Sequence, residues 1–200
     1  MRQRRFNSDE PEYARLQEWL RPGDIALDIG ANFGSYTLRM SELVGCAGRV
    51  FSFEPVPQTF HMLVRAVAAA GCRNVTTLNV ACSDRDGFVR MVVPDDELTG
   101  ENLYGASITD DTQHGLVVFR VCIDQLPLPR SGIRLVKVDA EGHDHLVISG
   151  MWELLKSCMP VLIAEHPRPD IVSRLENLGY SVTRSEKSPN SVFLPPVVGS

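Results

Sequence analysis

The 200-residue sequence lacks paired cysteines, apolar runs of bilayer length and an excess of positive charge. Its five cysteines are scattered singly without a C-x-x-C pair, so they predict neither a zinc site nor a disulfide framework. No apolar run is long enough to span a bilayer, and the basic start lacks the apolar stretch of a signal peptide. A formal net charge of -5 leaves no broad basic surface for nucleic acid. These absences predict a cytoplasmic protein with no membrane insertion and no nucleic-acid partner.

The composition is that of one globular domain. Hydrophobic residues make up 44% of the chain and charged residues 22%, a balance typical of globular rather than disordered proteins. A chain of this length builds one sizeable hydrophobic core and is too short for two ordinary domains. We therefore interpret residues 1–200 as a single domain with one functional site.

Strand-like and helix-like segments alternate along most of the chain, which predicts a parallel sheet covered by helices. The strands expected in this sheet are 25–29, 49–54, 75–80, 134–138, 161–164, 179–183 and 191–194. A helix is expected before the first strand, at about 10–20, and others between the strands, at 34–44, from after Pro57 to 70, at 144–156 and at 171–178. The predicted fold class is α/β, with a mostly parallel seven-stranded sheet, helices on both faces and an antiparallel terminal hairpin.

Two further runs, 87–93 and 116–122, are predicted to form strands of an exposed edge or hairpin. Such strands could also pair across a homodimer. The polar segment 94–115 between them is long enough to fold over an acceptor as a lid, or to be an ordinary surface loop. Its groups suited to hydrogen-bonding a polyol are Asn102, Tyr104, Ser107 and Thr109.

A glycine-rich turn follows the first predicted strand and leads directly into a helix. Its sequence is Asp28-Ile-Gly-Ala-Asn-Phe-Gly34. Small residues at such a turn let a ligand approach the backbone closely, although glycine there can also serve only as a tight connection. Glu54 ends the second strand, where open α/β sheets bind the ribose hydroxyls of a nucleotide. The two features together predict a nucleotide site at the carboxyl edge of the sheet.

The charge of this turn separates two classes of nucleotide. A dinucleotide presents an anionic pyrophosphate to the helix N-terminus, whereas S-adenosylmethionine presents an ammonium and a sulfonium. Asp28 would repel the first and attract the second, unless it only caps nearby backbone amides. The turn also lacks a full G-x-G-x-x-G, because Asn32 holds the second glycine position. The pattern therefore favours S-adenosylmethionine over a nicotinamide cofactor.

Four blocks between about residues 24 and 167 resemble the FkbM family of methyltransferases. The blocks are Asp28–Gly34 with Tyr36-Thr37 behind it, Phe53-Glu-Pro55, Asn79–Asp84 before Gly87, and Val136–His143. The resemblance implies a Rossmann-like class I methyltransferase fold with S-adenosylmethionine as the methyl donor. It also implies methylation of oxygen on a small hydroxylated acceptor, such as a sugar, a glycolipid or a natural-product intermediate.

The same resemblance implies a set of residues around the donor. Glu54 would hold the ribose, and the turn from Ala81 to Asp84 would border the adenine. Ser83 and Asp84 could equally form an ordinary turn. The residues implied for the methionyl part are Asp28, Gly30, Asn32 and Gly34, and the full cofactor-binding set adds Tyr36, Glu54, Ala81, Ser83 and Asp139.

Methyl transfer to a hydroxyl requires alignment of the two reactants and a base that removes the proton. Asp139, Glu141 and His143 follow the fourth core strand, at the edge where ligands bind. His143 is the favoured base by residue type, since histidine ordinarily titrates near neutral pH. Asp139 and Glu141 alternate with Ala140, which permits a carboxylate pair or a shared cation. His143 could instead only begin a helix, and either carboxylate could only fasten the loop.

Glu165 and His166 end the fifth core strand, beside the end of the fourth. This layout is similar to magnesium-dependent catechol O-methyltransferase, where ligands come from the ends of these two strands. Asp139 and Glu165 offer the oxygen ligands that magnesium prefers, whereas His166 does not. A magnesium site formed by Asp139, Glu165 and His166 is therefore a hypothesis with one ill-suited ligand.

The sequence is compatible with three functions. The favoured one is an S-adenosylmethionine-dependent O-methyltransferase. The alternatives are a nicotinamide-dependent oxidoreductase and a non-catalytic subunit that binds S-adenosylmethionine. Methylation of amines or nucleic acids is disfavoured, because no Asp/Asn-Pro-Pro-aromatic segment follows the fourth strand.

Overall fold

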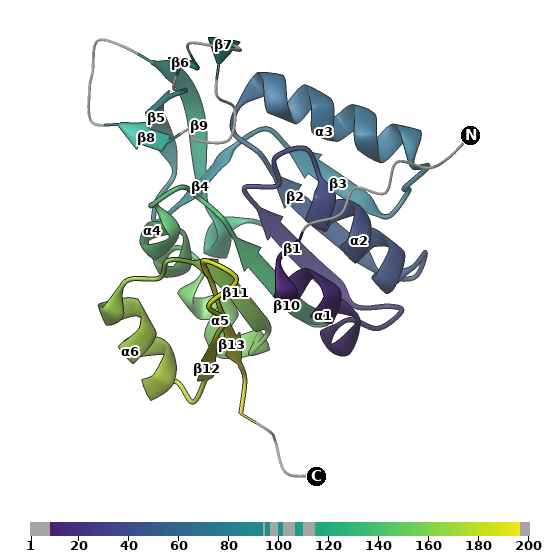
Figure 1. Cartoon of the computed structure of the whole chain (residues 1–200), viewed down its shortest axis with the longest axis vertical. Coiled ribbons are helices and arrows are strands. Elements are labelled where there is room, and N and C mark those ends of the chain that lie inside the picture. The colour runs from purple at the N-terminus through teal and green to yellow at the C-terminus, as the bar shows by residue number, and fades with distance from the viewer. Residues whose placement is uncertain (1–8, 94, 97–99, 102–106, 110–114, 197–200) are drawn as a thin grey trace.

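The computed structural model describes residues 9–93, 95–96, 100–101, 107–109 and 115–196 (Figure 1). Its parallel strands are β1 (Ile25–Ile29), β2 (Arg49–Phe53), β3 (Val75–Leu78), β10 (Ile133–Val138) and β11 (Val161–Glu165). The antiparallel hairpin consists of β12 (Ser181–Arg184) and β13 (Asn190–Leu194). Together they form one seven-stranded sheet in the order β12-β13-β11-β10-β1-β2-β3. The predicted fold class is confirmed, including the terminal hairpin.

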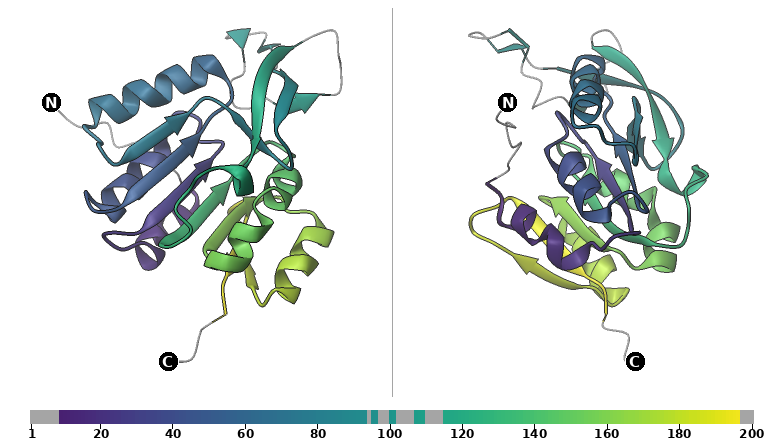
Figure 2. Two further views of the ribbon diagram at one scale, coloured as in Figure 1. Left: turned by 180° about the vertical axis from the view of Figure 1, so that it is seen from behind. Right: turned by 90° about the vertical axis from the view of Figure 1, so that its right-hand side faces the viewer.

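Helices cover both faces of this sheet (Figure 2). They are α1 (Pro11–Trp19), α2 (Ser35–Val44), α3 (Pro57–Ala69), α4 (Asp144–Ser149), α5 (Trp152–Cys158) and α6 (Pro169–Asn177). Because successive side chains of a strand point to opposite faces, each central strand contributes to two cores. In β10, Leu135 packs in the core with α1 and α2, whereas Val136 packs in the core with α4, α5 and α6. The sheet is therefore buried on both faces, which leaves the ends of its strands as the places where a ligand can bind.

The predicted helix over residues 144–156 is interrupted, which corrects the sequence-based prediction. It is divided into α4 and α5 at Gly150 and Met151. A side chain at Gly150 would overlap the carbonyl oxygen of Ser83, so the backbone of Gly150 lies directly against the backbone of β4 and its flanking residues. Asp124 then caps the new helix, because its carboxylate accepts hydrogen bonds from Glu153 N at 2.8 Å and Leu154 N at 2.9 Å. Both causes come from distant segments that helical periodicity does not reveal.

A smaller four-stranded sheet lies beside the main one, in the order β4-β9-β5-β8. Its strands are β4 (Ala81–Ser83), β5 (Gly87–Val92), β8 (Ser107–Thr109) and β9 (Leu116–Cys122), followed by the 3-10 helix η1 (Ile123–Gln125). The predicted hairpin strands pair antiparallel as β5 and β9. The predicted turn over residues 81–84 is instead mostly strand β4, because it pairs in parallel with β9.

The predicted lid falls largely outside the described residues. Asn102 and Tyr104 belong to the part that is not described, whereas Ser107 and Thr109 lie in β8. Within segment 94–115, the structure also describes a short ladder of β6 (Asp95–Asp96) and β7 (Gly100–Glu101). The lid and the homodimer both stay predictions.

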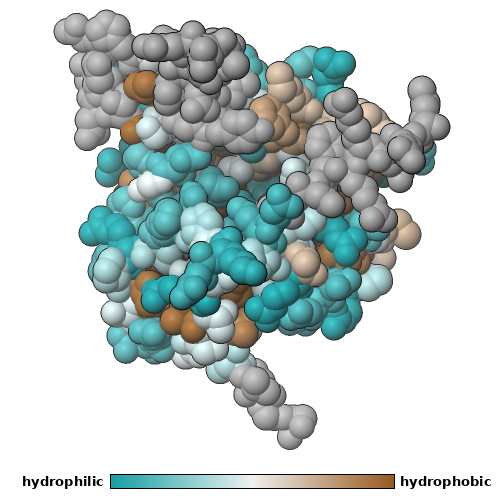
Figure 3. All heavy atoms as spheres, viewed as in Figure 1, coloured by the Kyte–Doolittle hydropathy of each residue, from teal (hydrophilic) through white to brown (hydrophobic). Residues whose placement is uncertain are grey.

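The surface seen in Figure 3 is mostly hydrophilic, with hydrophobic residues in scattered patches. Among the described residues, the most exposed large apolar residue is Phe88 of β5, at 74% exposure. It contacts Phe119 of β9 edge to face, with ring centroids 5.3 Å apart. No helix in the described ranges is long and apolar enough to cross a membrane.

Gly30 is required where β1 and β10 end side by side. Its φ of +76° is left-handed, and an added Cβ would overlap the carbonyl oxygen of Asp139. Gly23 also has a left-handed φ, of +96°, but open space around it. We expect Gly30→Ala to lower the free energy of unfolding by about 3 kcal/mol or more, and Gly23→Ala by only about 1–2 kcal/mol. Equal losses in urea denaturation would show that the close approach to Asp139 is unimportant.

Candidate active site

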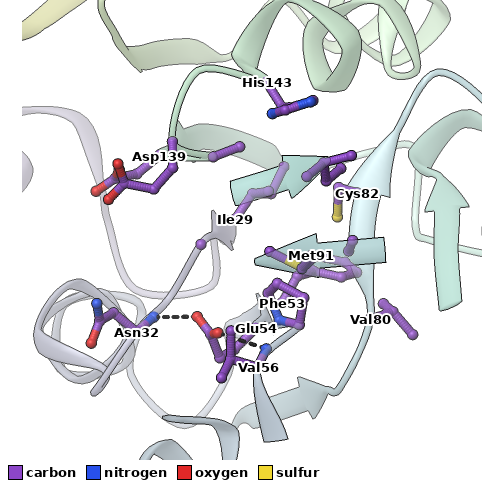
Figure 4. Close-up of a pocket in the computed structure, with 16 residues that line it drawn as sticks. Ile29, Asn32, Phe53, Glu54, Val56, Val80, Cys82, Met91, Asp139 and His143 are labelled. Atoms are coloured by element: carbon purple, nitrogen blue, oxygen red, sulfur yellow. Dashed lines mark hydrogen bonds between the residues drawn. The ribbon is translucent and has the colours of Figure 1, made fainter. Parts of the chain in front are cut away.

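A cavity of about 120 Å³ opens at the carboxyl edge of the main sheet, against the smaller sheet (Figure 4). Its lining comes from the ends of β1, β2 and β10 together with β4, β5 and β8. The predicted site residues that line it are Gly30, Asn32, Glu54, Ala81, Asp139, Glu141 and His143. The lining also includes Cys82, from the segment predicted to border the adenine, and apolar residues that were not predicted, among them Val56, Val80, Met91 and Ile108. The cavity therefore combines a polar floor with an apolar wall that the smaller sheet supplies.

The turn between β1 and α2 is tied to the neighbouring strand β2. The amides of Gly30 and Ala31 both donate to the carbonyl of Phe53 at 3.0 Å. Asn32 has a left-handed φ of 49°, and its side-chain oxygen accepts from Phe33 N at 2.8 Å. Gly34 lies behind the turn, where a Cβ would stand 2.7 Å from Leu63. Of the four residues implied for the methionyl part, Gly30 and Asn32 thus border the cavity.

Glu54 stands at the end of β2 with both carboxylate oxygens engaged. Oε2 accepts from Asn32 N at 2.9 Å and Oε1 accepts from Val56 N at 3.0 Å (Figure 4). Burial raises the pKa of Glu54 to about 7, although these two hydrogen bonds oppose the shift. Each oxygen keeps a lone pair, because a carboxylate offers about four acceptor positions. Glu54 is therefore held in place and still able to accept two hydroxyl groups.

Asp28 is buried behind the turn and does not line the cavity. Its Oδ2 accepts from Thr37 Oγ1 at 2.6 Å, and the strand register pairs it with Lys137 on one side and Ser52 on the other. Burial raises the pKa of Asp28, while the nearby Lys137 opposes that rise. The ammonium contact implied for Asp28 stays a prediction, and its observed contacts are internal.

Lys137 is a buried cation beneath the site. The sequence pattern did not predict a role for it. Its Nζ lies 2.8 Å from Asp139 Oδ2 and 4.6 Å from the ring centroid of Tyr36. Burial lowers the pKa of Lys137, but Asp139 and Asp28 together raise it above its ordinary value. Tyr36 is itself buried, and its hydroxyl donates to Glu10 at 2.5 Å. Tyr36 and Lys137 therefore support the site from below. The only signal in the sequence was a lysine between two valines near the end of a predicted core strand.

The segment between β10 and α4 contributes Asp139, Glu141 and His143 to the lining of the cavity. Asp139 and His143 lie on the side of the cavity opposite Glu54 (Figure 4). The segment is closed by Asp144, whose Oδ1 accepts from Ala140 N at 2.7 Å. Glu141 has a left-handed φ of 47°, and burial and the nearby Asp139 raise its pKa. His143 is the N-cap residue of α4, and its ring stacks with His145 at 6.4 Å between centroids. All three predicted catalytic residues thus meet at the cavity.

Of the three predicted metal ligands, Asp139 and Glu165 come together, whereas His166 lies apart from them. Glu165 forms a side-chain hydrogen bond with Asp139, and burial and Asp139 raise the pKa of Glu165 to about 7. His166 lines a separate hollow further along the sheet edge. In the part of the chain that the structure describes, no three His, Cys, Asp or Glu side chains form a group suited to a metal ion. The side chains therefore do not support the magnesium hypothesis.

The segment from Ala81 to Asp84, predicted to border the adenine, lines the cavity only in part. Ala81 lines the cavity, but Ser83 is fully buried behind it and its hydroxyl donates to Asp84 Oδ1 at 3.1 Å. The wall beside Ala81 comes from Val80 and from Met91 of the smaller sheet. Because β4 pairs with a strand some forty residues later, local sequence gives little indication of this wall.

Buried carboxyl groups at this edge should make stability depend on pH. Burial raises the pKa of Glu54 from 4.5 to about 7 and that of Asp144 from 3.8 to about 7. The folded state therefore holds protons that the unfolded state releases, and stability is lost as pH rises through this window. We expect the free energy of unfolding to fall by at least about 2 kcal/mol between pH 5 and pH 8. Urea denaturation at the two pH values checks this, and a rise in stability would contradict it.

The strand order and the site at the carboxyl edge define the class: an α/β domain with the class I methyltransferase fold. Within that class, the chain belongs to the FkbM methyltransferase family, because the model described as Methyltransferase FkbM domain matches residues 28–182. The resemblance predicted from the sequence blocks is therefore confirmed.

Three known proteins illustrate the similarity. Hexuronic acid methyltransferase AglP of Haloferax volcanii is 26% identical over 160 residues, which cover 78% of this chain and 61% of that protein. The crystal structure of methyltransferase FkbM from Methylobacillus flagellatus has a TM-score of 0.62 at 14% identity, covering 92% of this chain and 50% of the other. Fibrillarin of Aeropyrum pernix, with natively bound S-adenosyl-L-methionine, has a TM-score of 0.53 at 12% identity, covering 91% and 72%. The two structural similarities show the shared fold alone.

Proposed function

We propose that this protein is an S-adenosylmethionine-dependent O-methyltransferase that acts on a hydroxyl group of a sugar or a related small acceptor. The observation that carries the proposal is the anchored Glu54 carboxylate, which faces a cavity bounded by the Gly30–Asn32 turn. Membership of the FkbM family supports the donor, and similarity to a hexuronic acid methyltransferase supports a sugar acceptor. The chain spans 61% of that relative, so its acceptor is transferred here only as a proposal.

The donor would lie along the edge from β2 to β10. The two ribose hydroxyl groups would donate charge-assisted hydrogen bonds to the buried carboxylate of Glu54. Val80 and Met91 would pack against the adenine, and the backbone from Gly30 to Asn32 would border the methionyl part. When bound, S-adenosylmethionine supplies an electrophilic methyl group on a positively charged sulfur.

The acceptor would enter beside the segment between β10 and α4. His143 would take the hydroxyl proton as the acceptor oxygen forms its new bond to the methyl carbon and the bond from sulfur to that carbon breaks. Asp139, paired with Lys137, would orient the hydroxyl and add negative charge near the sulfonium. Glu141 at the rim is the second candidate base. The residues of this chain would thus align the acceptor hydroxyl with the methyl donor and remove its proton.

Two experiments test this function against its alternatives. Calorimetric titration should show binding of S-adenosylhomocysteine and no response to NADH, and the reverse would favour an oxidoreductase. Incubation with methyl-labelled S-adenosylmethionine and a panel of sugars and uronic acids should then give a labelled product in mass spectrometry. Binding without any labelled product on a broad panel would favour a non-catalytic binding subunit.

A further inference from the structure

A second hollow, of about 380 Å³, lies at the ends of the hairpin strands. Its polar lining consists of His166, Arg184, Ser185, Ser188, Asn190 and Ser191. These residues end β11 and β12 and begin β13, so the hollow belongs to the same edge of the sheet as the cavity. The role of this hollow is not part of the function proposed above.

The strand register places the hollow next to the cavity along the same edge of the sheet. Glu165, whose side chain bonds to Asp139, pairs with Asn190 in the next strand. Arg184 pairs with Ser191 one strand further on. Neighbouring strands are about 4.8 Å apart, so the step from β10 to β13 is about 10 Å. That distance suits an acceptor of one or two sugar units lying across the strand ends.

The floor of the hollow is fixed by a buried residue of α1. Glu12 is 3% exposed, and its Oε1 accepts from Ser188 Oγ at 2.6 Å and also from the side-chain amide of Asn190. His166 has a left-handed φ of 41°, and its amide donates to the carbonyl of Pro189 at 3.2 Å. Contacts from α1 and from the end of β11 to the loop before β13 and the start of β13 therefore hold the lining in one shape before any ligand arrives.

Arg184 gives the hollow its positive charge at the surface. Its Nε donates to Ser191 Oγ at 3.2 Å, which directs the side chain over β13 and occupies one of five guanidinium N–H groups. Arg184 is exposed, whereas the carboxylate of Glu12 is buried and already bonded below the floor. A ligand entering from solvent therefore meets the guanidinium first, and guanidinium groups bind carboxylates and phosphates with two parallel hydrogen bonds.

The cavity end of this edge carries carboxyl groups. Asp139 and Glu141 line the cavity, Asp139 is paired with the buried Lys137, and Glu165 hydrogen-bonds to Asp139, so Glu141 is the carboxylate there without a paired cation among these contacts. An acceptor with an anionic group would be repelled there and attracted at Arg184, so only one orientation is favourable. We infer that the second hollow is an acceptor subsite for the carboxylate or phosphate of an anionic sugar, with Arg184 as the main contact. This inference rests on the proposed function and names its substrate class.

The test uses the full chain saturated with S-adenosylhomocysteine, titrated with D-glucuronate, D-glucose 6-phosphate and D-glucose by ligand-observed NMR. We expect at least one anionic sugar to bind about tenfold or more tightly than glucose, and the two anionic arms show which group is preferred. Arg184→Gln should remove this preference. Arg134→Gln is the matched control, because Arg134 is exposed near Asp24 at the opposite end of the strands and should retain the preference.

Each outcome decides one question. Equal binding of all three sugars, no binding of any sugar, or an unchanged preference in Arg184→Gln would overturn the acceptor subsite. If S-adenosylhomocysteine still binds in those experiments, the proposed function stands without this subsite. If S-adenosylhomocysteine fails to bind the wild-type protein, the proposed function is wrong and the inference falls with it.

Discussion

Replacing Glu54 with glutamine should weaken the binding of S-adenosylhomocysteine by roughly ten to more than a hundredfold. The loss corresponds to about 1.5–3 kcal/mol, the typical value of hydrogen bonds to a charged acceptor. Glutamine keeps one oxygen for the Asn32 or Val56 amide, so the turn should remain folded. Calorimetric titration measures the affinity directly.

The matched control for this experiment is Glu42→Gln. Glu42 lies on the surface of α2, where its side chain is 70% exposed and pairs with Arg39. This control should bind the ligand as the wild type does, since surface ion pairs contribute little. If the folded Glu54 variant also keeps full affinity, the ribose does not bind at the end of β2.

Replacing His143 with alanine should lower turnover by about 10²–10⁴-fold, the usual contribution of a general base. Affinity for S-adenosylhomocysteine should hardly change, because the histidine would touch the acceptor hydroxyl and not the donor. Single-turnover rates with saturating donor measure the turnover, and calorimetric titration measures the affinity.

His145→Ala separates catalysis from packing in this experiment. His145 stacks with His143 but does not line the cavity, so its loss should leave turnover nearly unchanged. If the His143 variant keeps the full rate, Glu141 becomes the base to test. If all three variants keep it, including Glu141→Gln, alignment of the acceptor alone accounts for catalysis.

The main sheet could be predicted because its strands are short apolar runs between clear turn signals. Two local predictions were wrong for a common reason, namely contacts between distant segments. Gly150 interrupts the predicted helix where it meets Ser83, and Asp124 caps the helix that follows. Likewise, Ala81–Ser83 becomes a strand only because β9 lies beside it. Local propensity contains no information about such partners.

The polar side of the cavity could be predicted because its residues follow strand ends, which all meet at one edge of a parallel sheet. Gly30, Glu54 and His143 are examples. Asp28 differs because it stands within β1, on the side of the sheet that packs against α2, where it faces Lys137 across the register. The apolar wall and the hollow at Arg184 depend on non-local pairing and were not foreseen.

The central claim is that Glu54 and the adjoining turn form the site of a methyl donor. A crystal structure of the protein with S-adenosylhomocysteine tests it most directly. We expect both ribose hydroxyls within hydrogen-bonding distance of the Glu54 carboxylate, roughly 2.5–3.0 Å, with the adenine against Val80 and Met91. A ligand bound elsewhere, or one whose ribose does not contact Glu54, would contradict the claim.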